Sequence, residues 1–262
     1  MKNGFDQERS DGISANGVYL IDKPEGISSF AVVRRVRKLL GIKKVGHAGT
    51  LDPFASGLLV VCAGREATRH ISFFMEGQKE YRARLQLGIE TDTHDPEGTI
   101  TRTRPVPDLN EQQLTACLNR YLGQQWQTPP AFSALKHKGK PLYHYARQGV
   151  FISKDPRAIE IYSLQLVAFE ASAAQLDIAV QCSRGTYIRV LAHDIGNDLG
   201  CGAHLISLRR TGSGTARVAN ALDGKRLFSE ESKEYLLAKR HDIAHFLAMR
   251  EDKTSFNLPH AG

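Results

Sequence analysis

The segment Val45-Gly46-His47-Ala48-Gly49-Thr50-Leu51-Asp52-Pro53-Phe54-Ala55-Ser56-Gly57-Leu58-Leu59 organises this chain. It places one imidazole, one carboxylate and three glycines between a basic segment and an apolar run. Glycines at this density let the backbone turn tightly and approach another molecule closely. Proline disfavours the helical conformation for the residue before it, so Asp52 is expected in an extended or turn conformation. The segment therefore predicts a loop that holds Asp52 at its tip.

The composition is that of a globular protein with a moderate basic excess. The 262 residues include 35 Lys and Arg against 28 Asp and Glu, and the 41% of hydrophobic residues is enough for a substantial core. A net charge of +7 fits a polyanionic partner without requiring one. No uninterrupted apolar run approaches the roughly 18 residues of a membrane span, and the N-terminus is polar. We therefore expect a cytoplasmic protein with no membrane contact.

The cysteines and histidines do not predict a metal site. His241 and His245 are four residues apart and could share a helix face, but no glutamate of the His-Glu-x-x-His pattern and no third ligand accompany them. The cysteines are far apart, form no Cys-x-x-Cys pair and mostly lie in apolar segments, which predicts reduced core thiols. These cysteines are Cys62, Cys117, Cys182 and Cys201.

The residues before the Asp52 segment predict a strand, a turn and a helix. Residues 18–21 form the strand, and a proline-glycine turn at 23–26 ends it. Ser28 or Ser29 can cap the helix, which Gly41 closes. Its apolar positions are Phe30, Val33, Val36 and Leu40. Its basic residues fit a solvated face and a phosphate-contacting face equally well, and they are Arg34, Arg35, Arg37 and Lys38.

The residues after the Asp52 segment predict alternating strands and helices without a repeat or a linker. Residues 79–87 show the clearest period of two, which is typical of a strand. Asp108 and Glu111 resemble a capping box at the start of a helix that Gly123 ends. A single α+β domain is the simplest organisation. The other expected elements are strands at 58–62, 159–169 and 175–182, helices at 66–75, 141–148, 188–199 and about 229–249, a loop at 90–98, and a basic turn at 138–139.

Several motifs resemble those of the TruB family of pseudouridine synthases. Gly-His-Ala-Gly-Thr-Leu-Asp-Pro, followed by Ala-Ser-Gly-Leu-Leu, is similar to the family's catalytic motif, in which the aspartate is the catalytic residue. The resemblance runs in the family's order from about Val18 to about Arg210. The further matching segments are Asp22-Lys23-Pro24-Glu25-Gly26-Ile27-Ser28-Ser29, Lys79-Glu80-Tyr81, Ser133-Ala134-Leu135-Lys136, Gly139-Lys140-Pro141-Leu142-Tyr143, Cys182-Ser183-Arg184-Gly185-Thr186-Tyr187-Ile188-Arg189 and Gly202-Ala203-His204-Leu205-Ile206-Ser207-Leu208-Arg209-Arg210.

The resemblance implies a fold, a reaction and a partner. The fold is α+β, the pseudouridine synthase catalytic fold, with a mixed, largely antiparallel sheet flanked by helices. The reaction is the isomerisation of uridine to pseudouridine at position 55, in the T arm of tRNA, on a base flipped out of its stack. It is redox-neutral, so neither a metal nor an organic cofactor is expected. The partner is the tRNA T stem-loop, and no obligate protein partner is implied.

The resemblance also implies roles for individual residues. Asp52 acts as a nucleophile or as a base on a ribose proton, and the sequence does not choose between these. Arg189 keeps Asp52 ionised through a charge-assisted pair, and Tyr81 stacks on the uracil. Tyr187 hydrogen-bonds in the same pocket, Leu208 packs against the base, and His47 fills the space that the base vacates. The residues expected to contact RNA are Lys23, Arg34, Lys136 and Arg210.

Two other functions and one boundary question accompany this interpretation. A catalytically silent RNA-binding or RNA-folding module of the same shape would have no need of Asp52, Tyr81 and Arg189 together. A hydrolase that uses Asp52 with His47 would lack a second carboxylate, a Ser-His motif or metal ligands. We expect residues 1–16 to be a disordered extension, 17–250 the catalytic domain and 251–262 a tail, without the RNA-binding domain of the PUA type found in bacterial relatives.

Overall fold

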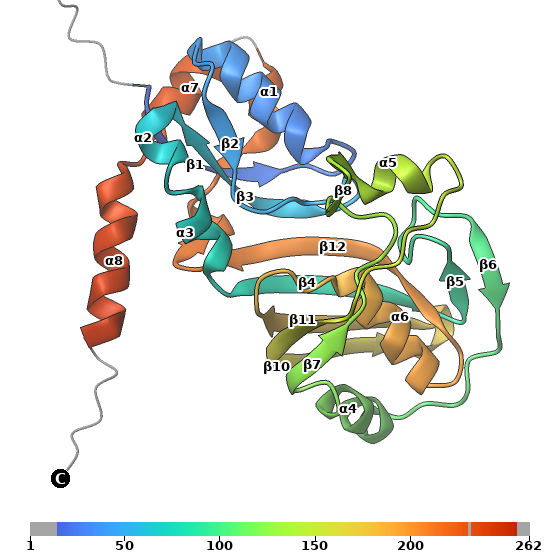
Figure 1. The fold of residues 1–262 in the computed structure, drawn as a ribbon. Helices are drawn as coiled ribbons and strands as arrows, with labels where there is room; N and C mark the ends of the chain where they lie inside the picture. Colours follow the sequence, from blue (N-terminus) through green and yellow to red (C-terminus); the bar gives the residue numbers. More distant parts are fainter. Residues whose placement is uncertain (1–14, 230–231, 256–262) are drawn as a thin grey trace, which may run out of the picture.

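A mixed ten-stranded sheet forms the centre of the computed structural model, which describes residues 15–229 and 232–255. Its main path runs β14-β1-β3-β12-β4-β11-β10-β7, with β2 on β3 and β13 on β12 (Figure 1). Two ladders are parallel, β1 with β14 and β12 with β3, and the other seven are antiparallel. The expected α+β fold with a mixed, largely antiparallel sheet is confirmed.

The strands and helices alternate along the chain, and they include strands at 45–47, 123–127 and 203–213 that the residue patterns did not predict. The strands of the main sheet are β1 (Gly17–Lys23), β2 (Val45–His47), β3 (Ser56–Ala63), β4 (Lys79–Leu87), β7 (Gly123–Gln127), β10 (Arg157–Glu170), β11 (Gln175–Cys182), β12 (Ala203–Ser213), β13 (Ala216–Arg217) and β14 (Leu222–Asp223). The helices are α1 (Ser29–Leu40), α2 (Gly64–Thr68), α3 (Ile71–Glu76), α4 (Glu111–Asn119), α5 (Leu142–Ala146), α6 (Ile188–Asp198), α7 (Ser232–Ala238) and α8 (Ile243–Ser255), with the 3₁₀ turn η3 at Gly224–Phe228.

The half of the sheet built from β1 and β3 is buried on both faces. Tyr19, Ile21, Leu59 and Val61 point to the side covered by α1 and α7. The alternate residues of the same strands point to the other side, where α2, α3 and α8 pack. A strand that is apolar on both faces reads as a continuous hydrophobic run, which is the pattern from residue 58 to residue 62.

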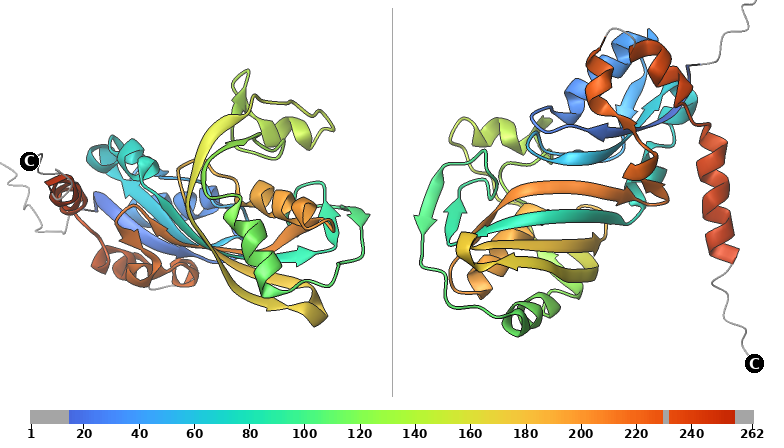
Figure 2. Two further views of the ribbon diagram at one scale, coloured as in Figure 1. Left: turned by 90° about the horizontal axis from the view of Figure 1, so that it is seen from below. Right: turned by 180° about the vertical axis from the view of Figure 1, so that it is seen from behind.

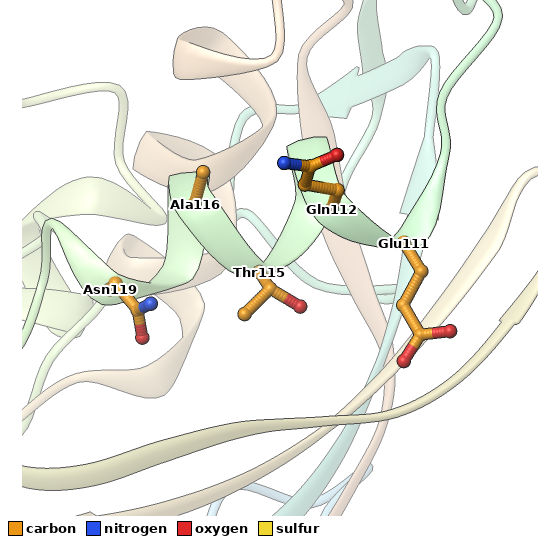
Figure 3. Close-up of a pocket in the computed structure, with 5 residues that line it drawn as sticks. All are labelled: Glu111, Gln112, Thr115, Ala116 and Asn119. Carbon is orange, nitrogen blue, oxygen red and sulfur yellow. The ribbon is translucent and has the colours of Figure 1, made fainter.

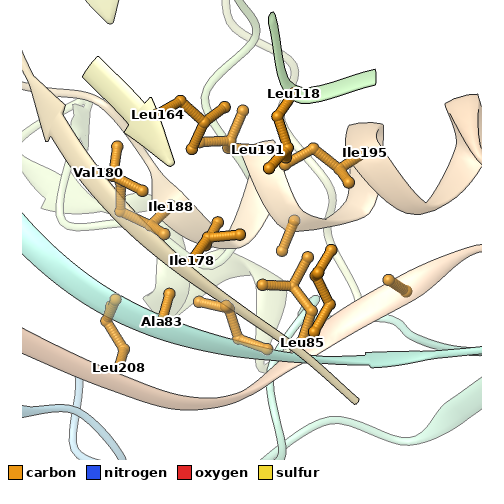
Figure 4. Packing of buried hydrophobic residues seen from close by; sticks show 14 of the residues in the cluster. Ala83, Leu85, Leu118, Leu164, Ile178, Val180, Ile188, Leu191, Ile195 and Leu208 are labelled. Carbon is orange, nitrogen blue, oxygen red and sulfur yellow. The ribbon is translucent and has the colours of Figure 1, made fainter. Parts of the chain in front are cut away.

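The largest core lies under α6, where β4, β10, β11 and β12 present one face each (Figure 4). Leu191 and Ile195 of α6 pack against Leu85 and Ile178 of the sheet, and α4 adds Leu118. Leu51 and Ala55, which flank Asp52, belong to this same core. The Asp52 loop is therefore packed into the main core through these two side chains.

Two small antiparallel pairs stand apart from the main sheet. Strands β5 (Ile89–Thr91) and β6 (Ile100–Thr103) pair with each other on either side of the loop 92–99. Strands β8 (Lys136–His137) and β9 (Lys140–Pro141) form a hairpin just before α5, and this segment projects away from the sheet (Figure 2). Lys138 and Gly139 have φ angles of 46° and 82°, so the basic turn predicted there is confirmed.

Some local expectations are wrong in detail. In α1, Ser29, Val32, Val33 and Val36 are buried, whereas Phe30 is 61% exposed, because the buried stripe begins one residue earlier than the apolar pattern indicates. The capping box of α4 uses Asn110 with Gln113 in place of Asp108 with Glu111. The single helix expected over 66–75 is two short helices, α2 and α3.

The C-terminal part is helical, and its boundaries differ from the expected ones. The helix expected over 229–249 is divided into α7 and α8, and between them His241 exchanges backbone hydrogen bonds of 2.9 Å with Val18 of β1. The boundary expected at residue 250 falls inside α8. Residues 1–14, where disorder is expected, and residues 256–262 of the expected tail lie outside the described residues.

The four cysteines are buried and unpaired, as expected for core thiols. Among the described residues, no helix is both long enough and apolar enough to cross a membrane.

Candidate active site

Asp52 lies in the loop between β2 and β3. Gly49 and Gly57 have φ angles of 100° and 101°, which favour glycine. A Cβ on Gly57 would lie 2.2 Å from the backbone oxygen of Arg210, so glycine is also required for the close approach to β12. The Asp52 side chain is 35% exposed while its neighbour Leu51 is 3% exposed. The loop thus presents one carboxylate to solvent while Leu51 and Ala55 on either side of it are buried.

Arg189 holds this carboxylate from the first turn of α6. Its Nε lies 2.9 Å from Asp52 Oδ2, and its side chain is 4% exposed. The other two guanidinium nitrogens are also engaged: Nη1 donates to Thr93 O at 2.9 Å and lies 3.4 Å from Asp95 Oδ2, and Nη2 donates to Phe132 O at 2.8 Å. A guanidinium used on all sides has a fixed orientation, so the position of Asp52 is fixed with it.

The loop between β5 and β6 supplies part of this network, which the sequence interpretation missed. Asp95 is buried, and its Oδ1 accepts hydrogen bonds from the Thr93 hydroxyl at 2.5 Å and from the Glu97 backbone at 3.0 Å. Burial raises the pKa of Asp95, and the hydrogen bond from Thr93 and the charge of Arg189 oppose the rise. The density of short polar residues at 90–98 was the available signal for an ordered loop, since the side chains of Asp and Thr hydrogen-bond to nearby groups in turns.

Lys23 is a buried support of the loop. It is 0% exposed, and its Nζ donates to the carbonyls of Pro24 at 2.9 Å, Ile27 at 2.7 Å and Pro53 at 3.2 Å. The Gly26 backbone also donates to Pro53 O at 2.9 Å. Burial lowers the pKa of Lys23 to about 8, and the charge of Asp52 opposes that change. The expectation that Lys23 contacts RNA phosphates does not fit this burial.

Arg210 is a second buried support. It is 1% exposed, its Nε donates to Leu58 O at 2.7 Å, and its Nη2 donates to Gly49 O at 3.1 Å. These contacts connect β12 to both ends of the Asp52 loop, across sequence separations of 152 and 161 residues. A side chain this deeply buried does not reach a phosphate, so the expected RNA contact of Arg210 is replaced by a structural one.

Tyr81 and Leu208 lie on the neighbouring strands β4 and β12. Tyr81 is opposite Arg210, and Leu208 is opposite Ala83. Tyr81 is partly buried against the main core, to which Leu208 belongs. Burial raises the pKa of the Tyr81 phenol, while the charge of Arg210 and a side-chain hydrogen bond with it act in the opposite direction. Tyr81 is therefore a protonated phenol at neutral pH, with a ring supported by the core.

His47 is the last residue of β2, next to the loop, and Tyr187 immediately precedes α6. Burial, with the charge of Arg210, lowers the pKa of His47, so the ring is neutral at pH 7. Gln127 holds the Tyr187 backbone in both directions: its Nε2 donates to Tyr187 O at 3.1 Å, and its Oε1 accepts from Tyr187 N at 2.8 Å. The Arg157 Cζ lies 4.9 Å from the centroid of the Tyr187 ring, within range of a cation–π contact.

Arg34 and Lys136 remain on the surface, on α1 and β8 respectively, and both are exposed. The structure therefore divides the four residues expected to bind RNA into two exposed cations and two buried supports. The burial of Lys23 and Arg210 has no signal in local sequence, because lysine and arginine are mostly exposed in proteins.

Within residues whose side chains are described, no group of three or more His, Cys, Asp and Glu could hold a metal ion. A hollow of about 540 Å³ lies over α4 (Figure 3). Its lining residues all come from the exposed face of that helix, so it is open surface: Glu111, Gln112, Thr115, Ala116 and Asn119.

Two family models match adjacent parts of the chain. Residues 37–188 match the TruB family pseudouridylate synthase N-terminal domain, and residues 189–247 match the tRNA pseudouridylate synthase B C-terminal domain. The chain belongs to the TruB family. Its second matched region is not a separate body, since β12 pairs with β3 and β4 inside the central sheet.

Curated relatives and solved structures agree with membership of the TruB family. The tRNA pseudouridine synthase B of Desulfotalea psychrophila is 54% identical over 226 residues, which cover 85% of this chain and 92% of the relative. That of Syntrophotalea carbinolica is 48% identical and covers 85% of this chain and 72% of the relative. A crystal structure of a Cbf5-Nop10-Gar1 complex superposes on 87% of this chain and 60% of that chain, with a TM-score of 0.65 and 28% identity. The resemblance seen in the sequence motifs is confirmed, and the chain is a pseudouridine synthase, an isomerase.

Proposed function

We propose that this enzyme converts uridine to pseudouridine at position 55 in the T arm of tRNA and that Asp52 is its catalytic carboxylate. The observation that carries the assignment is the ion pair of a partly exposed Asp52 with an almost fully buried Arg189. Most buried charges serve structure and are closed off on both sides. Here one oxygen of the pair is fixed by the protein, while part of the carboxylate is open to a ligand.

The reaction needs one such group. The N1–C1′ bond of uridine breaks, the base turns, C5 joins C1′, and the proton of C5 leaves while N1 gains one. An ionised carboxylate near the ribose can act as a nucleophile or remove a ribose proton, and both roles require that its charge be maintained. The fixed guanidinium of Arg189 pairs with this carboxylate and sets its direction in either case.

Tyr81, Leu208, His47 and Tyr187 would form the pocket for the base. The Tyr81 ring would provide a flat wall, supported by the core, over which uracil can turn, and Leu208 would pack against the base. The neutral ring of His47 carries no charge that would have to be desolvated when it enters a base stack, which suits it to fill the space of the extruded uridine.

The choice of tRNA rests on the relatives, because those named above are called tRNA pseudouridine synthase B. The exposed Arg34 and Lys136 are the residues that we assign to phosphate contacts, and the activity then belongs to the cytoplasm, where tRNA is modified. A catalytically silent RNA-binding module is disfavoured, because it would gain nothing from a carboxylate held open to an anionic ligand.

The test is tritium release from tRNA that carries 5-tritiated uridine. We expect wild type to release tritium in proportion to pseudouridine formed at position 55, and Asp52→Asn to release none above background. Asp52→Asn should still bind tRNA within a few-fold of wild type, since one carboxylate contributes little among many phosphate contacts. Turnover by Asp52→Asn would disprove the role of Asp52.

Three RNA substrates test the T-arm assignment. If the enzyme reads the shape of the T loop, kcat/KM for an isolated T-arm minihelix should approach that for whole tRNA. A minihelix with a rearranged loop should be a poor substrate, because the cost of extruding the base is no longer offset by shape-specific contacts. Equal modification of the rearranged loop would contradict recognition by shape.

A further inference from the structure

Ser29 makes a paired contact with the residue that precedes Asp52. Its Oγ donates to Leu51 O at 2.8 Å and accepts from Leu51 N at 2.8 Å. Ser29 is 2% exposed and Leu51 is 3% exposed, so neither hydrogen bond competes with bulk water. One hydroxyl therefore satisfies both backbone polar groups of Leu51, across 22 residues of sequence.

Helix capping does not explain this serine. The N-cap of α1 is Ser28, whose exposed side chain accepts a hydrogen bond from the Ala31 backbone at 3.1 Å. Ser29 is the first residue inside the helix, where its hydroxyl is not needed to satisfy the first turn. The two adjacent serines thus have different roles: Ser28 caps the start of α1, and Ser29 contacts the Asp52 loop.

With this contact, the residues on both sides of Asp52 are held by hydrogen bonds. On the other side of Asp52, the carbonyl of Pro53 accepts from Lys23 Nζ at 3.2 Å and from Gly26 N at 2.9 Å. Both chain neighbours of Asp52 are therefore tied to the short segment 23–29, from the last residue of β1 to the first residue of α1. Arg189 fixes the carboxylate itself, but the backbone that carries it is fixed by this segment.

We propose that Ser29 is a positioning residue for the reaction, which acts by holding the Leu51 peptide and thereby the backbone of Asp52. The inference rests on the proposed role of Asp52. Without the hydroxyl, the N–H and the carbonyl of Leu51 remain buried without hydrogen-bond partners, and a buried polar group without a partner costs free energy. The loop relieves that cost by shifting until water or another group reaches Leu51, and Asp52 shifts with it.

The test compares Ser29→Ala with Ser28→Ala and Ser29→Thr. Displacement of a catalytic group by about 1 Å costs on the order of 100-fold in rate, so Ser29→Ala should lower kcat by about 10- to 100-fold while KM for tRNA stays within twofold. Ser28→Ala loses only a helix cap, so it should lower Tm and leave kcat within twofold of wild type. Ser29→Thr retains the hydroxyl and should recover most of the kcat that Ser29→Ala loses.

Three results would overturn the inference: a kcat of Ser29→Ala within twofold of wild type, an equal loss of kcat in Ser28→Ala, or a folded Ser29→Thr that is as slow as Ser29→Ala. If Ser29→Ala does not fold, Ser29→Cys, whose thiol is a weak donor and acceptor of similar size, decides by the same criteria, with an intermediate kcat expected. A wild type that forms no pseudouridine in tRNA would instead refute the proposed function. If wild type forms pseudouridine in tRNA and Ser29→Ala is equally active, only the role of Ser29 is refuted.

Discussion

Replacing Arg189 with lysine removes the planar guanidinium with its several donors and keeps the positive charge. The guanidinium reaches Asp52, Thr93 O, Asp95 and Phe132 O at distances from 2.8 to 3.4 Å, in four directions that one ammonium cannot serve together. At least two of these groups lose their partner, and each unpaired buried group costs about 1–3 kcal/mol. Because Asp52 is 35% exposed, we discount its share and expect Arg189→Lys to lower the free energy of unfolding by about 2–4 kcal/mol.

The catalytic effect of Arg189→Lys should exceed what stability alone explains. A carboxylate released from its fixed partner moves by roughly 1 Å or more, so kcat should fall by on the order of 100-fold under conditions where the variant is still folded. Urea denaturation measures the first quantity and tritium release at saturating tRNA the second. The matched control is Arg184→Lys, an exposed arginine five residues earlier, which should change neither. A folded Arg189→Lys with kcat within twofold of wild type would refute the reasoning.

Four further outcomes are expected. Gln127→Leu removes both hydrogen bonds to the Tyr187 backbone and should cost about 2 kcal/mol of unfolding free energy and lower kcat; an unchanged kcat would separate Tyr187 from the site. The pKa of Lys23 is lowered from 10.5 to about 8, so the unfolded chain binds more protons between these pH values and stability rises with pH there. In denaturation experiments, the free energy of unfolding of wild type minus that of Lys23→Met should therefore rise by roughly 3 kcal/mol from pH 8 to pH 10.5. A difference that does not change with pH would contradict the burial of a charged lysine. Lys136→Ala should weaken tRNA binding and reduce the slope of log K against log salt by roughly 0.7–0.9, with kcat unchanged; an unchanged slope would remove Lys136 from the RNA contacts. Activity should survive exhaustive dialysis against a chelator, and a loss restored only by zinc would contradict a metal-free reaction.

The two buried lysine and arginine supports affect how variants of this enzyme should be interpreted. Lys23 and Arg210 both contact the Asp52 loop through backbone carbonyls, and both are fully buried. Loss of activity on their substitution would report displacement of the loop and not loss of RNA contact. Salt dependence of binding distinguishes the two explanations, since only a lost phosphate contact changes its slope.

Local sequence determined the elements whose residues interact with near neighbours. The alternation of residues 79–87 predicts β4, Ser28 and Gly41 bound α1, and Lys138-Gly139 turns the β8–β9 hairpin, because periodicity, caps and turns depend on a few adjacent residues. The motif around Asp52 was also readable, since it is contiguous and its glycines and proline constrain the backbone directly.

Only the tertiary structure decided what these elements hold in place. Arg189 meets Thr93 and Phe132 across 96 and 57 residues, and Arg210 meets Gly49 across 161, so no local pattern could pair them. The same reason applies to charge: Lys23 and Arg210 read as surface cations until the fold surrounds them with carbonyls. Ser29 and Ser28 are the same residue type at adjacent positions. Only the fold separates them: Ser28, the N-cap outside the helical turns, is exposed to solvent, whereas Ser29, the first helical residue, is buried against Leu51. The contact with Leu51 spans 22 residues of sequence, so it forms only when the tertiary structure brings the two segments together.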